Sequence, residues 1–280
     1  MKKNDLITLD IVENVSLGRS IAYYEGRKVL LDGGYEGQNV EARITKCKEK
    51  RIEATIVNVN KRADYQIEAL CPDFDKCGGC GFQDIPYEKQ LELKENYVKN
   101  LFIKAGIDFN GWEHILPSPV TRNYRNKMEF SFGDYVKDGP LALGMHEKGK
   151  HYNILPVHDC TISPEDFNKI TKACENFFQK LGYKYYNKIG KTGFLRHLVL
   201  RKSFAKNELL INLVTTSEQM MDDSAFVNML LSLDLSSKVA GIIHTYNDSF
   251  SDAVVAQRID VIYGEACITE EICGLKFKIG

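Results

Sequence analysis

The sequence lacks any long apolar run. Hydrophobic residues make up 44% of the 280 residues, but no stretch approaches the roughly 20 consecutive apolar residues that a membrane-spanning helix needs. The first residues, Met1 to Asp5, lead directly into an alternating segment and contain no apolar core of the kind found in signal peptides. These absences predict a cytoplasmic protein that has no contact with a membrane.

A charge excess of either sign is also lacking. The 37 lysines and arginines are balanced by 38 aspartates and glutamates, which leaves a formal net charge of −1. General attraction to nucleic acid is therefore excluded, and any such site must be a local patch. The length suits one large or two modest domains. No feature indicates an obligate protein partner, so we expect a monomer.

Cysteines are present in an unusual arrangement. Cys71, Cys77 and Cys80 follow a C-x5-C-x2-C spacing with glycines beside the last two, and Cys160 offers a fourth thiol. Clustered thiols without a secretion signal indicate metal ligands rather than disulfides. Four thiolates suit either a structural zinc ion or an iron–sulfur cluster. The single C-x2-C pair favours iron–sulfur, and unliganded buried thiols are the remaining alternative.

Residues 1–60 show short alternating runs separated by glycines. About five strands at ten-residue spacing predict a small closed barrel of the OB type, which binds single-stranded nucleic acid. Aromatic rings beside cations could stack bases and hold phosphates. The candidate RNA contacts in this barrel are Tyr23, Tyr24, Arg27 and Lys28, and a basic connector formed by Lys46, Lys48, Lys50 and Arg51. The alternative is an ordinary solvated charged turn.

Residues 61–280 alternate between strand-like and helix-like patterns, which predicts a mixed α/β domain. A helix at 87–106 carries apolar residues on one face and ends at Gly106. Two groups of cations could bind RNA phosphates: Arg122, Arg125 and Lys127 in the first, and Arg196, His197 and Arg201 in the second. Salt bridging within the domain is the alternative for these side chains.

Several segments resemble one known family. The run from Cys71-Pro72 to Cys77-Gly78-Gly79-Cys80-Gly81-Phe82-Gln83, with the Tyr87 and Lys89-Gln90 that follow, is similar to the cluster-binding segment of bacterial RNA (uracil-5-)-methyltransferases. The branch that modifies 23S rRNA resembles it most. Tyr124-Arg125-Asn126-Lys127, Leu195-Arg196-His197-Leu198-Val199 and Leu213-Val214-Thr215 add to the likeness.

The resemblance implies an RNA-binding TRAM domain at 1–60 and a central domain at 61–280. It implies a 4Fe-4S cluster on Cys71, Cys77, Cys80 and Cys160, with residues 70–87 as the main cluster segment. It also implies methyl transfer from S-adenosylmethionine to a uridine of 23S rRNA.

In this family the catalytic cysteine and the S-adenosylmethionine site lie in a C-terminal Rossmann-like domain. The only Gly-rich candidate here, residues 32–37, falls among the barrel turns. The resemblance therefore predicts that this domain is absent from the chain. It also predicts that no catalytic or S-adenosylmethionine-binding residue is present and that the chain alone is inactive. The helix at 87–106 would then dock on the missing domain.

Two other functions fit parts of the sequence. The first is a stand-alone, non-catalytic RNA-binding iron–sulfur protein. The second is a radical enzyme that modifies tRNA, because some of these also carry a TRAM domain. Radical enzymes of this kind use C-x3-C-x2-C and leave one iron site open, whereas the spacing here differs and a fourth cysteine is available.

Overall fold

A computed structural model describes every residue except 17, 50, 109 and 251–255. The chain forms two compact units, Met1–Leu70 with Gly81–Pro119, and Cys71–Cys80 with Val120–Gly280. The structural division therefore does not fall at residue 60, where the sequence placed a domain boundary. The chain leaves the first unit to place a ten-residue cysteine loop in the second, and then returns.

The first unit contains a closed five-stranded barrel in the order β1-β2-β3-β5-β4, which confirms the predicted barrel. The strands are β1 (Leu6–Ser16), β2 (Arg19–Tyr24), β3 (Arg27–Asp32), β4 (Asn39–Lys48) and β5 (Arg51–Lys61). Alternate residues such as Ile7, Leu9 and Ile11 on β1 point into the barrel and are buried. β3 and β5 pair in parallel and the other neighbours are antiparallel, so the sheet closes without a free edge.

Residues after the cysteine loop pack onto the barrel unit through buried polar contacts. The Tyr35 hydroxyl donates to the Gly81 carbonyl at 2.9 Å and to Asp84 Oδ1 at 2.8 Å. Burial and the neighbouring Asp84 carboxylate raise the pKa of Tyr35 well above its ordinary value, so the phenol stays protonated and remains a donor. Ile85 is 1% exposed beside this pair. The segment is therefore anchored in the first unit.

Helix α1 (Tyr87–Lys104) was predicted correctly in position but not in burial. None of its residues is buried, although the sequence indicated an apolar face for docking. Leu93 packs beside the small cluster of Tyr35, Ala63 and Ile85, and polar contacts add to this. Glu95 accepts from Lys99 Nζ at 2.6 Å and from Trp112 Nε1 at 2.9 Å, and its second oxygen accepts from the Ile115 amide at 3.3 Å. These bonds hold the loop after α1 alongside the helix.

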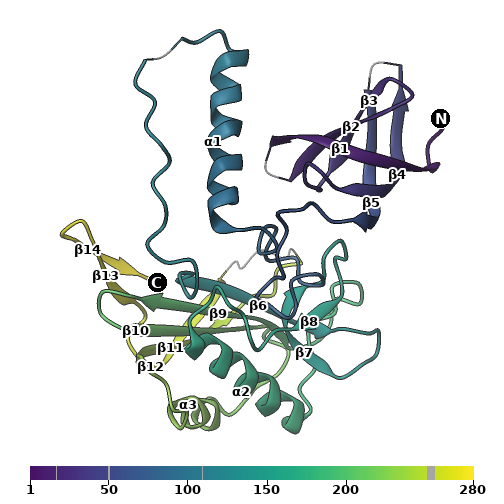
Figure 1. Cartoon of the computed structure of the whole chain (residues 1–280). Coiled ribbons are helices and arrows are strands. Elements are labelled where there is room, and N and C mark those ends of the chain that lie inside the picture. The colour runs from purple at the N-terminus through teal and green to yellow at the C-terminus, as the bar shows by residue number, and fades with distance from the viewer. Residues whose placement is uncertain (17, 50, 109, 251–255) are drawn as a thin grey trace. The chain divides into compact units, whose positions relative to one another are not determined.

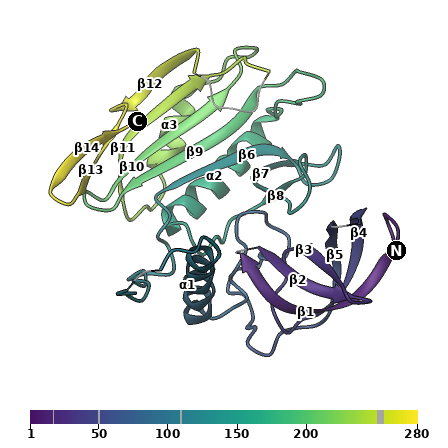
Figure 2. The ribbon, with the colours of Figure 1, turned by 90° about the horizontal axis from the view of Figure 1, so that it is seen from above.

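The second unit is built on a seven-stranded sheet in the order β12-β11-β10-β9-β6-β7-β8, as Figure 2 shows. β10 and β11 are parallel, and the other neighbours are antiparallel. The strands are β6 (Lys127–Asp134), β7 (Leu141–His146), β8 (Ile154–Pro156), β9 (Leu195–Ser203), β10 (Glu208–Thr215), β11 (Lys238–Tyr246) and β12 (Arg258–Gly264).

Helices α2 (Glu165–Leu181) and α3 (Asp223–Leu231) cover one face of this sheet (Figure 1). Phe167 and Phe178 on α2 and Phe226 on α3 share one core with inward residues of the strands, and all three are fully buried. α2 ends at Gly182, whose φ of +70° is the left-handed conformation that suits glycine. Since one face is occupied by helices, alternate residues on the strands point to the opposite face.

A short hairpin, β13 (Ile268–Ile272) and β14 (Leu275–Ile279), follows β12. Ile268 packs with Leu210 and Ile243. The Glu270 carboxylate accepts from the amides of Phe204 at 2.9 Å and Ala205 at 3.1 Å, which fixes the hairpin to the β9–β10 turn. Among the described residues, no helix is long and apolar enough to cross a membrane.

Candidate functional site

The cysteine loop is shaped by its own backbone and by the turn after β7. The Cys71 carbonyl accepts from the Phe74 amide at 3.2 Å, and the Asp73 carbonyl accepts from the Cys77 amide at 2.7 Å. The Gly78 amide then donates to the His146 carbonyl at 3.0 Å. A Cβ at Gly78 would lie 3.1 Å from that carbonyl oxygen, so this close approach requires glycine. The loop thereby becomes part of the second unit.

Cys160 reaches the same region from the segment that precedes α2. Asn168 on α2 accepts from the Cys160 amide at 3.2 Å and donates to the Cys160 carbonyl at 3.2 Å. The side chain of Cys160 also packs against the core between the sheet and the helices. These two hydrogen bonds fix the backbone of Cys160, although Cys160 lies 80 residues after Cys80 in the sequence.

The four thiols lie close enough to influence one another. The pKa of Cys77 is raised, chiefly by burial. The Gly79 amide, which donates to the Cys77 sulfur at 3.4 Å, acts in the opposite direction. Negative charge on the other three cysteines, Cys80, Cys160 and Cys71, adds to the increase. Burial likewise raises the pKa of Cys71, and the Cys160 and Cys80 thiolates add to this effect. No disulfide joins any of the eight cysteines, all of which are described. These mutual effects place the four sulfurs in one region of the second unit.

The two metal alternatives place different demands on the sulfurs. One zinc ion draws its sulfurs to about 2.3 Å from a single point. Within the described part of the chain, no three His, Cys, Asp or Glu side chains are grouped to hold one metal ion. In a multi-iron cluster each thiolate binds a different iron atom, so the sulfurs stay farther apart. Four thiols without a histidine are a donor set that either centre accepts.

On the barrel, the two predicted tyrosines differ. Tyr23 is 56% exposed, whereas Tyr24 packs against the barrel core. Lys28 lies directly opposite Tyr23 across the β2–β3 pair and is exposed. The Arg27 guanidinium donates to the carbonyls of Lys48 and Glu49 at 3.2 and 3.3 Å. Tyr23 and Lys28 therefore form the accessible ring and cation of this group.

The predicted basic connector is shorter than the sequence indicated. Lys46 and Lys48 lie within β4 and Arg51 begins β5, while Lys50 lies outside the described residues. Lys46 Nζ is 3.6 Å from Glu53, which also pairs with Arg51. Glu53 thus partly neutralises Lys46 across the β4–β5 pair and Arg51 on its own strand. Lys48 and Arg51 are both exposed.

The basic segment before β6 lies beside the residues that follow Cys160. The Asn123 amide donates to Thr161 at 3.1 Å, and the Arg125 amide donates to Ile162 at 2.9 Å. Arg122 and Arg125 are both exposed. The backbone that carries Cys160 thus also positions these two cations.

Arg196 and His197 do not have the positions expected of RNA contacts. Both are 4% exposed. Arg196 Nη1 donates to the carbonyls of Asn247 at 2.8 Å and Ser249 at 2.7 Å, and its guanidinium lies 4.4 Å from the Tyr186 ring centroid. His197 Nδ1 is 3.3 Å from Ser131 Oγ. The prediction for these side chains is corrected, because internal contacts rather than solvent surround them.

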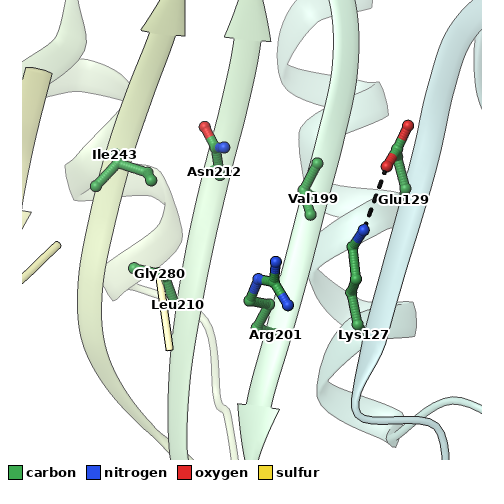
Figure 3. Close-up of a pocket in the computed structure, with 8 residues that line it drawn as sticks. All are labelled: Lys127, Glu129, Val199, Arg201, Leu210, Asn212, Ile243 and Gly280. Atoms are coloured by element: carbon green, nitrogen blue, oxygen red, sulfur yellow. Dashed lines mark ion pairs between the residues drawn. The ribbon is translucent and has the colours of Figure 1, made fainter. Parts of the chain in front are cut away.

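Lys127 and Arg201 line a pocket of about 260 Å³ on the sheet face away from the helices, shown in Figure 3. The other lining residues are Glu129, Val199, Leu210, Asn212, Ile243 and Gly280. Glu129 balances part of the charge, with its Oε2 3.6 Å from Lys127 Nζ. The volume is just below the roughly 300–1,000 Å³ of pockets for drug-sized ligands, so a single small anionic group suits it. A cationic wall over an apolar floor can hold a phosphate with its sugar or base.

Asn212 and Glu129 were not singled out from the sequence. The alternation on β10 offered a signal, because Leu209, Ile211 and Leu213 belong to the core and Asn212 must therefore face the other side. The alternation predicts a binding role for Asn212 only when β10 is known to pair with β9, which carries Arg201.

No family model matches the chain. The chain is similar to RNA methyltransferases. A protein of Clostridium tetani named an uncharacterized RNA methyltransferase is 42% identical over 279 residues, which cover 100% of this chain and 61% of the relative. A relative with the same description from Caldanaerobacter subterraneus is 40% identical over 279 residues, which cover 100% of this chain and 62% of that protein. The chain thus spans about three fifths of the length of the curated relatives that it matches.

A crystal structure shares the fold. The Pyrococcus abyssi tRNA (uracil-54, C5)-methyltransferase, solved in complex with S-adenosyl-L-homocysteine, matches with a TM-score of 0.69 at 20% identity. The match covers 97% of this chain and 59% of that chain. At this identity it shows a common fold.

These matches correct the last part of the predicted fold class. The sequence predicted that a Rossmann-like methyltransferase domain is absent from this chain, which would leave the chain inactive and α1 without its docking partner. That prediction is wrong, because 97% of the chain matches a methyltransferase structure. It rested on the family resemblance and on the lack of a suitable Gly-rich turn in this sequence, which spans about three fifths of its relatives. Inactivity does not follow either.

Proposed function

We propose that this protein takes part in methylating C5 of uracil in RNA, with S-adenosylmethionine as the methyl donor. The fold match to a uracil-C5 methyltransferase over 97% of the chain carries this proposal. The names of the relatives support it, since they describe RNA methyltransferases. The role of this chain's own residues is to bind the RNA and to present the target nucleotide, which must leave its stack before a base can be modified.

Two surfaces serve RNA binding in this proposal. On the barrel, Tyr23 stacks a base while Lys28 holds a phosphate. In the second unit, Arg122 and Arg125 contact phosphates, and the pocket at Lys127 and Arg201 takes one nucleotide. Both surfaces lie on regular strands or on backbone fixed by hydrogen bonds. This rigidity supports specific binding, because little ordering is needed when the RNA arrives.

The substrate that we propose is 23S rRNA. Support comes from the likeness of the Cys71–Gln83 run to the branch that modifies this RNA. The solved relative acts on tRNA according to its name. Both RNAs therefore belong in the test.

We further propose that Cys71, Cys77, Cys80 and Cys160 hold a 4Fe-4S cluster. When bound, such a cluster supplies a multi-bond crosslink between the loop at 71–80 and the segment before α2. Metal–ligand bonds of this kind contribute directly to folding free energy. Because Thr161 and Ile162 hold the backbone of residues 123 and 125, a fixed Cys160 also steadies the basic segment beside it. The protein acts in the cytoplasm as a monomer, where reducing conditions preserve thiolates.

A second candidate is a non-catalytic RNA-binding iron–sulfur protein. The observation that favours it is that both the gathered thiols and the cationic pocket belong to this chain. It differs from the first candidate in predicting RNA binding without any change in RNA methylation.

The direct test is the content of 5-methyluridine in RNA from cells with and without the gene. We expect mass spectrometry of fragments of 23S rRNA to show 5-methyluridine at one or more positions, lost on deletion and restored by the complete gene. Loss from tRNA instead would retain the reaction and overturn the rRNA substrate. Unchanged 5-methyluridine in both RNAs would overturn the methylation proposal and favour the second candidate.

A further inference from the structure

The second unit carries an exposed aromatic ring that the site described above does not use. Phe250 is 74% exposed, in the loop that follows β11. Lys191 Nζ lies 4.4 Å from the centroid of its ring, within the range of a cation–π contact. The contact joins two segments that are far apart in the sequence, 187–192, which carries Lys191, and 247–250, which carries Phe250.

The segment that carries Lys191 is a tightly closed turn. The Asn187 side-chain oxygen accepts from the amides of Ile189 at 2.9 Å and Gly190 at 2.8 Å. The Asn187 carbonyl accepts from the Lys191 amide at 2.7 Å, and its amide donates to Thr192 at 2.8 Å. A turn with this many internal bonds projects its side chains in a fixed direction.

The loop that carries Phe250 is held as firmly. Arg196 donates to the carbonyls of Asn247 and Ser249, and the Asn247 amide donates to Thr215 at 2.8 Å. Asp248 accepts from the amide and the hydroxyl of Ser217 at 2.7 and 2.8 Å. The buried Arg196 therefore supports the backbone that presents Phe250. The exposed ring is thus carried on backbone that hydrogen bonds hold in place.

The charge of the segment that carries Lys191 indicates the kind of partner. Residues 180–192 contain four lysines and no acidic residue. The lysines, at 180, 184, 188 and 191, are all exposed. The supporting loops also carry acids: Glu218 accepts from the Gly193 amide at 2.8 Å, Asp248 accepts from Ser217 at 2.7 Å, and Asp252 lies outside the described residues. An exposed ring among cations is the composition that stacks bases and holds the backbone of single-stranded nucleic acid.

We propose that Phe250 and Lys191 form a further RNA contact, in which a nucleobase stacks on the free face of the Phe250 ring and the neighbouring lysines hold the adjoining phosphates. The proposal rests on the proposed RNA-binding function and adds a stacking site to it. The exposed Ile189 side chain, beside Lys191 in the same turn, extends the apolar surface for the sugar or base.

The test is the affinity of the purified chain for a fluorescently labelled single-stranded RNA, measured by anisotropy at several salt concentrations. Phe250→Ala should weaken binding at least about fivefold, which is the lower end for loss of one stacked base. Phe250→Trp should bind like the unaltered chain because it keeps a stacking ring. Lys191→Met should reduce the salt dependence by about one phosphate contact.

A matched control is available at Phe204. It is 48% exposed and has Lys202 Nζ 5.6 Å from its ring centroid, but it lies at the β9–β10 turn. Phe204→Ala should leave RNA affinity unchanged. If the unaltered chain binds RNA and Phe250→Ala binds equally well, or if Phe250→Trp loses as much as Phe250→Ala, this contact is overturned and the proposed function stands. If the unaltered chain binds no RNA, both are overturned.

Discussion

Lys127 on β6 and Arg201 on β9 are directly opposite each other in an antiparallel pair, and both line the same pocket. Like charges in this register destabilise a sheet. Glu129 offsets only one of the two, since it pairs with Lys127. A sheet that keeps such a pair at a pocket is suited to binding an anion there. The paired cations Lys127 and Arg201 are therefore the side chains that we expect to contact an RNA phosphate.

The first prediction concerns this pair. Arg201→Gln should weaken RNA binding and reduce the slope of log affinity against log salt by about one contact, because one phosphate loses its cation. Lys172→Gln removes the same charge from an exposed position on α2, on the other side of the sheet, and should leave that slope unchanged. Equal slopes for the two variants would show that the pocket does not meet phosphate.

The second prediction concerns the cysteines. Cys160→Ser should reduce the iron content of anaerobically purified protein from about four per chain to well below that value, and should lower its melting temperature, because the crosslink to α2 loses a ligand. Cys273→Ser, at an exposed thiol on the β13–β14 turn, should change neither quantity. Stoichiometric zinc in place of iron would contradict the cluster.

The third prediction is a pH dependence in the first unit. The Lys99 ammonium, followed by Trp112, the Ile115 amide and His114, holds the pKa of Glu95 at about 2, against an ordinary value of 4.5. Because the folded-state pKa is lowered, the contribution of Glu95 is complete above pH 4.5 and is lost as the pH falls towards 2. Hydrogen exchange of residues 112–115 should therefore accelerate over this range.

Glu95→Gln should produce the same faster exchange at neutral pH, since the amide cannot attract Lys99. Glu92→Gln removes a carboxylate that pairs only with Lys89 on the same helix and serves as the control. If exchange in the loop is unaffected by Glu95→Gln, the loop is held by other contacts.

The fourth prediction separates a structural arginine from a binding one. Arg196→Met should lower the free energy of unfolding by about 1.5–3 kcal/mol, because two carbonyls lose a charged donor within the protein. Arg201→Gln, on the same strand but at the pocket, should stay within about 0.5 kcal/mol. Urea unfolding of both variants is the measurement. A larger loss of unfolding free energy for Arg201→Gln than for Arg196→Met would contradict the structural role of Arg196.

The sequence was sufficient for elements that depend on local pattern. The barrel strands alternate with period two, and the turn between β2 and β3 contains Glu25 and Gly26, which adopt φ values of +50° and +74°. Helix α1 was placed from apolar spacing and the glycine that follows it. Helix α3 begins at Asp223, because Asp222 caps it by accepting from the Ala225 amide.

Burial and neighbours in space could not be predicted in the same way. Arg196 and Arg201 lie on one strand within the same basic run, yet the first supports a loop and the second lines a pocket. Their difference arises from the strands and loops that pack around β9, which no local pattern shows. For the same reason, the sequence offered no sign that Phe250 would meet Lys191. The grouping of Cys160 with a loop 80 residues earlier was predicted from ligand chemistry alone.

The central claim is that the residues of this chain bind RNA, and the most direct measurement is the dissociation constant of the purified chain for single-stranded RNA as a function of salt. We expect binding at low salt and a linear fall of log affinity with log salt, because exposed cations on both units displace counterions from phosphates. Absence of binding at low salt, or an affinity that does not depend on salt, would contradict the account.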